Sequence, residues 1–182
     1  MGEKLSEGIP YRDGEDIHAL SPRCRLDVYR PEDPEARCPV VVWLYGGGLT
    51  SGERHIPAEL KGQGMVVVAP DYRLSPSVRA PAYIEDAAAA VAWAFKKIHA
   101  YGGDPERIIV AGASAGAYLA NMITLDHRWL ARHNVEAGRI AGLVSMTGQM
   151  ITHFTVRAEA VPEASKTVSI NCMMWRCMLV FP

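Results

Sequence analysis

The residues best suited to chemistry lie at 112–116, where the sequence has the pattern G-x-S-x-G with Ser114 at its centre. An apolar run comes directly before this pattern, and a segment with helical periodicity follows it. Between a strand and a helix, the pattern predicts a sharp turn that lifts the serine hydroxyl clear of the sheet. Gly112 and Gly116 leave room for such a turn. Ser114 is therefore a candidate nucleophile for acyl transfer.

A second candidate feature is the glycine run Gly46, Gly47 and Gly48, which also follows an apolar segment. Glycines expose backbone N–H groups without side chains in the way. Together with the N–H of Ala115, at the start of the helix after the serine, the N–H groups of Gly46 and Gly47 are candidate oxyanion donors. Both motifs follow predicted buried strands, and their joint order is more specific than either pattern alone.

A dinucleotide-binding turn is the main alternative for residues 112–116. That site expects its glycine turn after the first strand and a further glycine two residues on, where this chain has Tyr118. The sequence also lacks a later Tyr-x-x-x-Lys, and no Gly-Lys-Ser/Thr follows the glycines as in a phosphate-binding loop. These departures favour the serine nucleophile.

Strand-like and helical segments alternate around the two motifs. We predict strands at 25–29, 39–44, 65–70, 108–111 and 140–144, and helices at 83–100 and 115–132. Most of these strands are continuous apolar runs, typical of a parallel sheet that is buried on both faces. The order predicts a single α/β domain, a three-layer α/β/α sandwich with a mostly parallel sheet. Residues 1–20 are polar, and we expect an irregular arm there.

The composition fits one globular domain. The 182 residues are 49% hydrophobic and 21% charged, with a formal net charge of −1. Without a basic block, nucleic acid is not an expected partner. The longest apolar run, at 87–95, is too short to span a membrane. No metal-ligand spacing joins the four cysteines, Cys24, Cys38, Cys172 and Cys177, so we expect no metal site. Structural or incidental thiols are the default in a reducing compartment, so we expect a cytoplasmic protein.

The chain resembles the carboxylesterase and lipase branch of the α/β-hydrolases, which includes hormone-sensitive-lipase-like and feruloyl-esterase-like enzymes. The similarity spans about residues 10–159 and rests on segments 42–52, 70–76, 84–87, 102–105, 112–116 and 148–153, with Trp93. It implies cleavage of small carboxylic esters through an acyl-serine intermediate, without an organic cofactor. Many members have histidine at the position of Tyr45, and that change leaves the backbone donors in place.

The resemblance also implies an aspartate and a histidine that activate the serine and follow it along the chain. The only later aspartate is Asp126, which a helix starting at the serine would place about 18 Å away. His153 follows the last predicted strand, and a structural hydrogen-bond role is favoured over that of a substitute base. We expect Asp71 to make a structural ion pair or turn bond. Asp86, in the first turn of its predicted helix, is expected to interact with the helix dipole.

The family match fades near residue 159, and residues 160–182 form an atypical tail rich in methionine and cysteine. We therefore expect a single, incomplete domain, truncated or frameshifted, whose sheet lacks its last strands and helices. The exposed sheet edge would favour aggregation or a partner, with a homo-oligomer as one candidate. Two functions follow from this expectation. One is an ester hydrolase impaired by loss of its acid and base, and the other is an inactive fragment or binding module.

Overall fold

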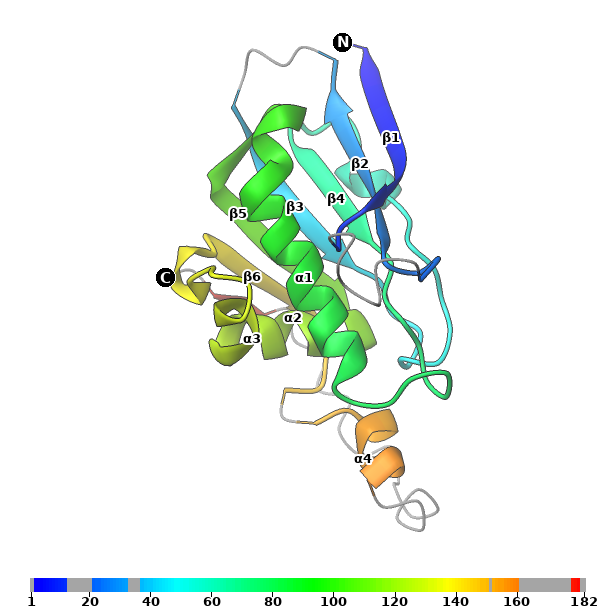
Figure 1. Cartoon of the computed structure of the whole chain (residues 1–182). Coiled ribbons are helices and arrows are strands. Elements are labelled where there is room, and N and C mark those ends of the chain that lie inside the picture. The colour runs from blue at the N-terminus through cyan, green and yellow to red at the C-terminus, as the bar shows by residue number, and fades with distance from the viewer. Residues whose placement is uncertain (1, 13–20, 33–36, 151, 161–177, 181–182) are drawn as a thin grey trace.

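The computed structural model describes residues 2–12, 21–32, 37–150, 152–160 and 178–180. Its strands form one sheet in the order β1-β2-β4-β3-β5-β6-β7 (Figure 1). They are β1 (Glu3–Pro10), β2 (Arg25–Pro31), β3 (Cys38–Leu44), β4 (Val66–Pro70), β5 (Gly103–Ala113), β6 (Gly142–Met146) and β7 (Met178–Val180). The helices are α1 (Ala82–Lys97), α2 (Ala115–Leu125), α3 (Arg128–Ala131) and α4 (Phe154–Ala160), with 3₁₀ turns at Ala58–Leu60, Ile98–Tyr101 and Ala137–Arg139.

The centre of the sheet is parallel, as the sequence predicted. Strands β4, β3, β5 and β6 run in one direction, and all five residues of β4 are buried. Leu44 at the end of β3 lies opposite Gly112 near the end of β5. The two motifs that follow these strands therefore reach the same edge of the sheet.

Helices α1 and α2 contact each other and the parallel strands, so they form one layer against one face (Figure 1). The alanine-rich α1 buries most of its residues, because small side chains allow close packing on the sheet. The connection from β3 to β4 has only the 3₁₀ turn Ala58–Leu60. The α/β fold with a mostly parallel sheet is confirmed, and the described residues show one helical layer.

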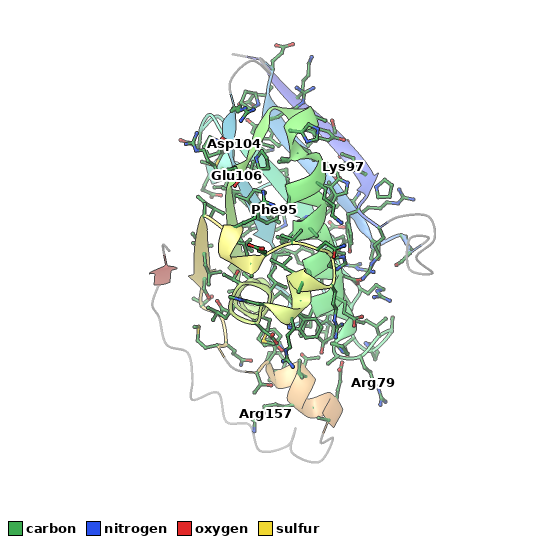
Figure 2. The ribbon with its side chains drawn as sticks, turned by 60° about the vertical axis from the view of Figure 1, so that its left-hand side comes forward. Arg79, Phe95, Lys97, Asp104, Glu106 and Arg157 are labelled. Atoms are coloured by element: carbon green, nitrogen blue, oxygen red, sulfur yellow. The ribbon has the colours of Figure 1, made fainter. Side chains whose placement is uncertain are left out.

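The two ends of the sheet face opposite ends of the molecule. Figure 2 shows Asp104 and Glu106, at the start of β5, far from Arg79 and Arg157, which lie beside or within α4. The loops after the carboxyl ends of the parallel strands gather at the α4 end. In open α/β sheets, ligands bind outside the carboxyl ends of the strands.

The N-terminal segment is a strand where we expected an irregular arm. Strand β1 pairs antiparallel with β2, and the register shifts between Ser6 and Ile9 around Gly8, which has a φ of 66°. The prediction for residues 3–10 was wrong because an edge strand with little burial needs no apolar run; Leu5 is 52% exposed. Residues 13–20 of the predicted arm lie outside the described residues.

The helix predicted at 115–132 is two helices. Helix α2 ends at Leu125, and Asp126 takes an extended conformation with φ −100° and ψ 93°. The Asp126 carboxylate accepts hydrogen bonds from Arg128, at 2.9 Å from Nε and 2.7 Å from Nη2, as α3 begins. This local pairing ends the regular helix. Asp126 lies at the opposite end of α2 from Ser114.

The sheet edge beyond β6 is paired. Strand β7 runs antiparallel to β6, with Leu143 opposite Val180. The expectation of an exposed edge at β6 was therefore wrong, because a short strand from the tail occupies it. Residues 161–177 and 181–182 of the predicted atypical tail lie outside the described residues. In the part of the chain that the structure covers, no helix is both long and apolar enough to cross a membrane.

Candidate active site

Ser114 lies on a sharp turn between β5 and α2. Its φ of 53° and ψ of −116° are strained for a residue with a side chain, and the residue is exposed. The Ser114 N–H donates to the carbonyl of Met146 at 2.8 Å, which fixes the turn to the end of β6. We call residues 112–116 the serine turn. Its geometry presents the serine hydroxyl at the carboxyl edge of the sheet.

Gly112 and Gly116 of the serine turn lie where no larger residue fits. A Cβ on Gly112 would lie 2.4 Å from the carbonyl carbon of Gly116. A Cβ on Gly116 would lie 2.0 Å from the carbonyl oxygen of Leu44 and 2.4 Å from that of Tyr45. Real Cβ atoms do not approach backbone atoms so closely. The prediction that small residues allow strand and helix to pack closely here is confirmed.

The second motif lies directly against the serine. We call residues 45–52 the glycine loop. A Cβ on Gly46 would lie 3.3 Å from the Cβ of Ser114 and 3.1 Å from the carbonyl oxygen of Ala113. Gly47, with a φ of 122°, begins a turn in which its carbonyl accepts the N–H of Ser51 at 3.0 Å. The structure thus brings Gly46 and Ser114 together and places Gly47 one residue further along.

Ala115 completes the set of predicted site residues. It is the first residue of α2 and is fully buried. The N–H groups in the first turn of a helix have no acceptor within that helix, and the helix dipole favours negative charge at this end. The N–H groups of Gly46, Gly47 and Ala115 therefore come from two segments that meet at Ser114.

A polar cluster that the sequence did not predict holds the glycine loop. The Tyr45 hydroxyl donates to Asp71 Oδ1 at 2.5 Å, and Arg23 Nη2 lies 2.9 Å from both of these groups. The Tyr72 hydroxyl donates to the carbonyl of Tyr45 at 2.7 Å, and the two rings stack with centroids 4.4 Å apart. The structural ion pair expected for Asp71 is confirmed. The hydrogen bond between Asp71 and Tyr45 could not be predicted from the sequence, because the two residues are 26 positions apart.

Burial sets the protonation of this cluster. It raises the pKa of Asp71, although the hydrogen bond from Tyr45 and the charge of Arg23 act in the opposite direction. Burial also raises the pKa of the Tyr45 hydroxyl far above its ordinary value, and the hydrogen bond to Asp71 acts in the same sense. Tyr45 therefore remains a hydrogen-bond donor at neutral pH.

Asp86 has a different role from the one expected. Its carboxylate is fully buried and lies 2.7 Å from Arg73 Nε and 2.5 Å from Arg12 Nη2. Helix α1 begins at Ala82, so Asp86 lies beyond its first turn, where the helix dipole has most of its effect. Asp86 therefore ties the segment after β1 to α1 through its ion pairs. The expectation that Asp86 interacts mainly with the helix dipole was wrong.

His153 is a buried, neutral ring. Its side chain packs between Phe154 and Tyr118, with ring centroids 4.2 and 5.5 Å away, and Nδ1 accepts the N–H of Thr155 at 3.2 Å. Burial lowers the pKa of His153 to about 4. These contacts agree with the structural role that the sequence favoured. Within the described residues, the Ser114 hydroxyl has no hydrogen-bond partner, and no cluster of potential metal ligands is found.

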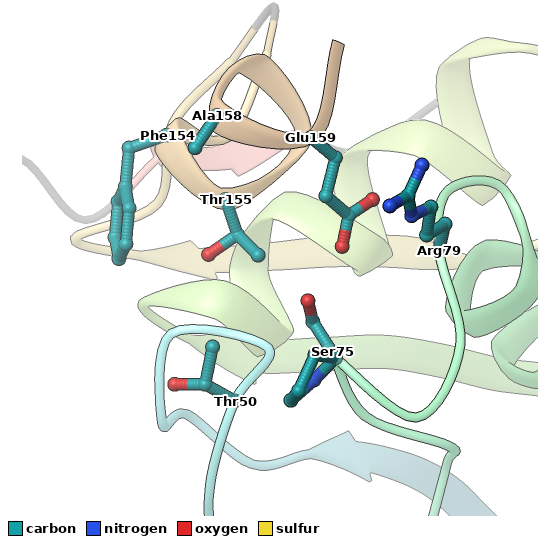
Figure 3. Close-up of a pocket in the computed structure, with 8 residues that line it drawn as sticks. Thr50, Ser75, Arg79, Phe154, Thr155, Ala158 and Glu159 are labelled. Carbon is teal, nitrogen blue, oxygen red and sulfur yellow. The ribbon is translucent and has the colours of Figure 1, made fainter. Parts of the chain in front are cut away.

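A pocket of about 490 Å³ opens beside the glycine loop (Figure 3). Thr50 of the loop lies on one side of the pocket, and Phe154, Thr155, Ala158 and Glu159 of α4 lie on the other. The Thr155 hydroxyl donates to the carbonyl of Gly48 at 2.5 Å, so α4 is fastened directly to the loop. Sequence reasoning missed this pocket because its walls are far apart along the chain.

A protein-family model agrees with this arrangement. The BD-FAE model matches residues 26–155, well over half of the chain. The chain belongs to the BD-FAE family. The match includes both the glycine loop and the serine turn. This protein is therefore an α/β-hydrolase of the carboxylesterase and lipase group.

Named relatives of this BD-FAE chain are esterases. It is 42% identical over 98 residues to carboxylesterase NlhH of Mycobacterium tuberculosis (strain CDC 1551 / Oshkosh), a match covering 51% of this chain and 31% of NlhH. It is 38% identical over 115 residues to esterase LipC of Mycobacterium tuberculosis (strain ATCC 25618 / H37Rv), covering 60% of this chain and 28% of LipC. The matched part thus spans about a third or less of the length of these relatives.

The fold is shared with a solved esterase. The structure of esterase B from Lactobacillus rhamnosis (HN001) matches with a TM-score of 0.68 and 23% identity. The match covers 90% of this chain and 53% of esterase B. At this identity the likeness establishes the fold alone, and the chain corresponds to about half of the esterase B structure.

Proposed function

We propose that this chain is a carboxylic ester hydrolase that works through an acyl-serine intermediate at Ser114. The observation that carries the proposal is the contact between the strained, exposed Ser114 and Gly46 of the glycine loop. An exposed serine hydroxyl beside backbone N–H groups suits attack on an ester carbonyl. The esterase relatives support this reaction, and small-molecule esters are the proposed substrates.

In the proposed reaction, Ser114 Oγ attacks the ester carbonyl and the carbonyl oxygen gains negative charge. The N–H groups of Gly46, Gly47 and Ala115 stabilise that charge, and loss of one such donor costs about 3–4 kcal/mol of transition-state stabilisation. The alcohol then leaves, and water releases the acid from the serine. A base must accept the Ser114 proton, and we assign no described residue to this step.

A binding module without catalysis is the second candidate. It is favoured by one observation: among the described residues, no side chain hydrogen-bonds to the Ser114 hydroxyl. Such a module would keep the pocket and the fold and would bind esters without cleaving them.

Covalent labelling distinguishes the two functions. A fluorophosphonate probe should label the chain rapidly, and peptide mass spectrometry should locate the adduct on Ser114. The Ser114→Ala variant should not react, whereas Ser77→Ala, a change at an exposed serine on another loop, should react like the parent protein. If the folded parent protein is not labelled, the hydrolase proposal fails and the binding module is supported.

A further inference from the structure

One peptide group of the glycine loop has a proposed oxyanion donor at one end and a buried hydrogen bond at the other. The carbonyl of Tyr45 and the N–H of Gly46 belong to this group, which is planar and trans. The Tyr72 hydroxyl donates to the carbonyl at 2.7 Å. In a trans peptide the carbonyl and the N–H point in opposite directions, so the Gly46 N–H points away from Tyr72. Holding the carbonyl therefore fixes the direction of the donor.

The Tyr72 side chain is itself held firmly. It is fully buried, and its ring stacks on the Tyr45 ring with centroids 4.4 Å apart and planes 9° apart. Its backbone carbonyl accepts a hydrogen bond from Arg23 Nε at 2.9 Å. Burial raises the pKa of the Tyr72 hydroxyl far above its ordinary value, so Tyr72 remains a donor at neutral pH. The hydroxyl thus has a fixed position from which to hold the carbonyl.

Tyr72 is the one donor to this carbonyl among the residues that the structure describes. The next peptide group of the loop differs. It joins the carbonyl of Gly46 to the N–H of Gly47, and that carbonyl accepts no hydrogen bond from any described residue. The Gly46 N–H donates to none of the described acceptors, so within this part of the chain it is available to an oxyanion. Tyr72 therefore acts on the Gly46 donor in particular.

We propose that Tyr72 is a positioning residue, which keeps the Gly46 N–H directed at the oxyanion through the Tyr45–Gly46 peptide group. The proposal rests on the hydrolase function proposed above, and it adds a residue that acts only through the backbone of another. Charge on the ester oxygen develops in the transition state. A misaligned donor therefore lowers the rate constant of the reaction more than the affinity for the ester.

The Tyr72→Phe change removes this hydroxyl and keeps the stacked ring. We expect the maximal rate constant of fluorophosphonate labelling at Ser114 to fall about 10- to 100-fold, with the half-saturating probe concentration unchanged within about 2-fold. Tyr45→Phe is the matched variant, because it also removes one buried hydroxyl but leaves the Tyr45 carbonyl paired. Its rate constant should fall less than about 3-fold, since the Gly46 donor keeps its direction. Tyr101→Phe should be labelled like the parent protein.

A second measurement reads the direction of the donor without any reaction. The residual dipolar coupling of an N–H group in NMR depends on its orientation. In the parent protein, the Gly46 coupling should therefore fit the alignment defined by the amides of the central strands. The Gly46 coupling should depart from that fit in Tyr72→Phe and keep it in Tyr45→Phe. Urea denaturation of the two variants should give similar losses, so a difference in labelling would not reflect stability.

Equal labelling of Tyr72→Phe and Tyr45→Phe would overturn the proposal, as would a Gly46 coupling that Tyr72→Phe leaves unchanged. If Tyr72→Phe does not fold, the parent protein still decides, because a Gly46 coupling that does not fit the central strands overturns the proposal. If the parent protein is not labelled, the hydrolase function fails. The Gly46 couplings then decide separately whether Tyr72 orients this N–H group.

Discussion

The serine turn and the glycine loop meet at one edge of the sheet but are held in place by different forces. In the serine turn, Gly112 and Gly116 lie so close to backbone atoms that no Cβ fits. The glycine loop is held by side chains from distant segments, through Arg23, Asp71 and Thr155. Steric exclusion therefore limits which residues can replace the glycines of the turn. The position of the loop depends instead on several side-chain contacts, each of which can be removed by a single substitution.

The largest expected effect is from Gly116→Ala in the serine turn. The new Cβ would overlap the carbonyl oxygens of Leu44, at the end of β3, and of Tyr45, at the start of the glycine loop, and this backbone cannot move aside cheaply. We expect a loss of about 4 kcal/mol or more in the free energy of unfolding, measured by urea denaturation. Gly138→Ala is the matched control, because its Cβ would meet no atom within 4 Å. A loss below about 1 kcal/mol for Gly116→Ala would show that the turn can shift.

The next effect concerns the buried His153, next to the Thr155 contact with the glycine loop. Its pKa is about 4 in the folded chain and about 6.5 when unfolded, so the unfolded chain binds the extra proton first. Stability from this group is full above pH 6.5 and is lost as the pH falls toward 4, by roughly 2–3 kcal/mol. Urea denaturation from pH 7 to pH 4 measures the loss.

The matched comparison for this pH effect uses two histidines. His153→Gln should flatten the pH dependence, whereas the change His127→Gln, at an exposed histidine, should leave it as in the parent protein. Parallel curves for the parent and His153→Gln would show that His153 does not cause the loss.

Asp71→Ala should weaken the support of the glycine loop. It removes the acceptor of the Tyr45 hydroxyl and the partner of Arg23, so we expect a loss of about 2 kcal/mol in unfolding free energy. The rate of fluorophosphonate labelling at Ser114 should also fall, because the loop N–H groups lose their fixed position. Asp126→Ala removes a pair whose arginine is 85% exposed, far from the glycine loop, and should change neither quantity much. Equal losses in the two variants would contradict a special role for Asp71.

Tyr45→Phe is the smallest of these changes. It removes one hydroxyl and keeps the ring stacked on Tyr72, while Asp71 and Arg23 still pair. We expect a loss of about 1 kcal/mol, measured by thermal unfolding, and a modest decrease in the labelling rate at Ser114. Tyr101→Phe is the control, because the Tyr101 hydroxyl makes no hydrogen bond to any described residue. A larger loss than for Asp71→Ala would reverse the order predicted here.

Local sequence patterns were enough to predict the central strands, the serine nucleophile candidate and the two glycine motifs. Continuous apolar runs identify β3, β4 and β5 because a parallel sheet is buried on both faces. The glycine pattern around Ser114 spans five residues, so it can be recognised in the sequence, although the space for Gly116 is limited by Leu44 and Tyr45 of another segment. These features leave a recognisable pattern in consecutive residues, so the order of residues is enough to predict them.

Contacts between distant segments were needed to reveal the edge strand β1, the partners of Asp86 and the support of the glycine loop. Strand β1 has no apolar run because pairing with β2, and not burial, defines it. The contacts of Asp71 with Tyr45, and of Thr155 with Gly48, join segments 26 and 107 residues apart. The pocket with Glu159 arises in the same way. Such contacts are set by which segments the sheet brings together, and no local periodicity encodes them.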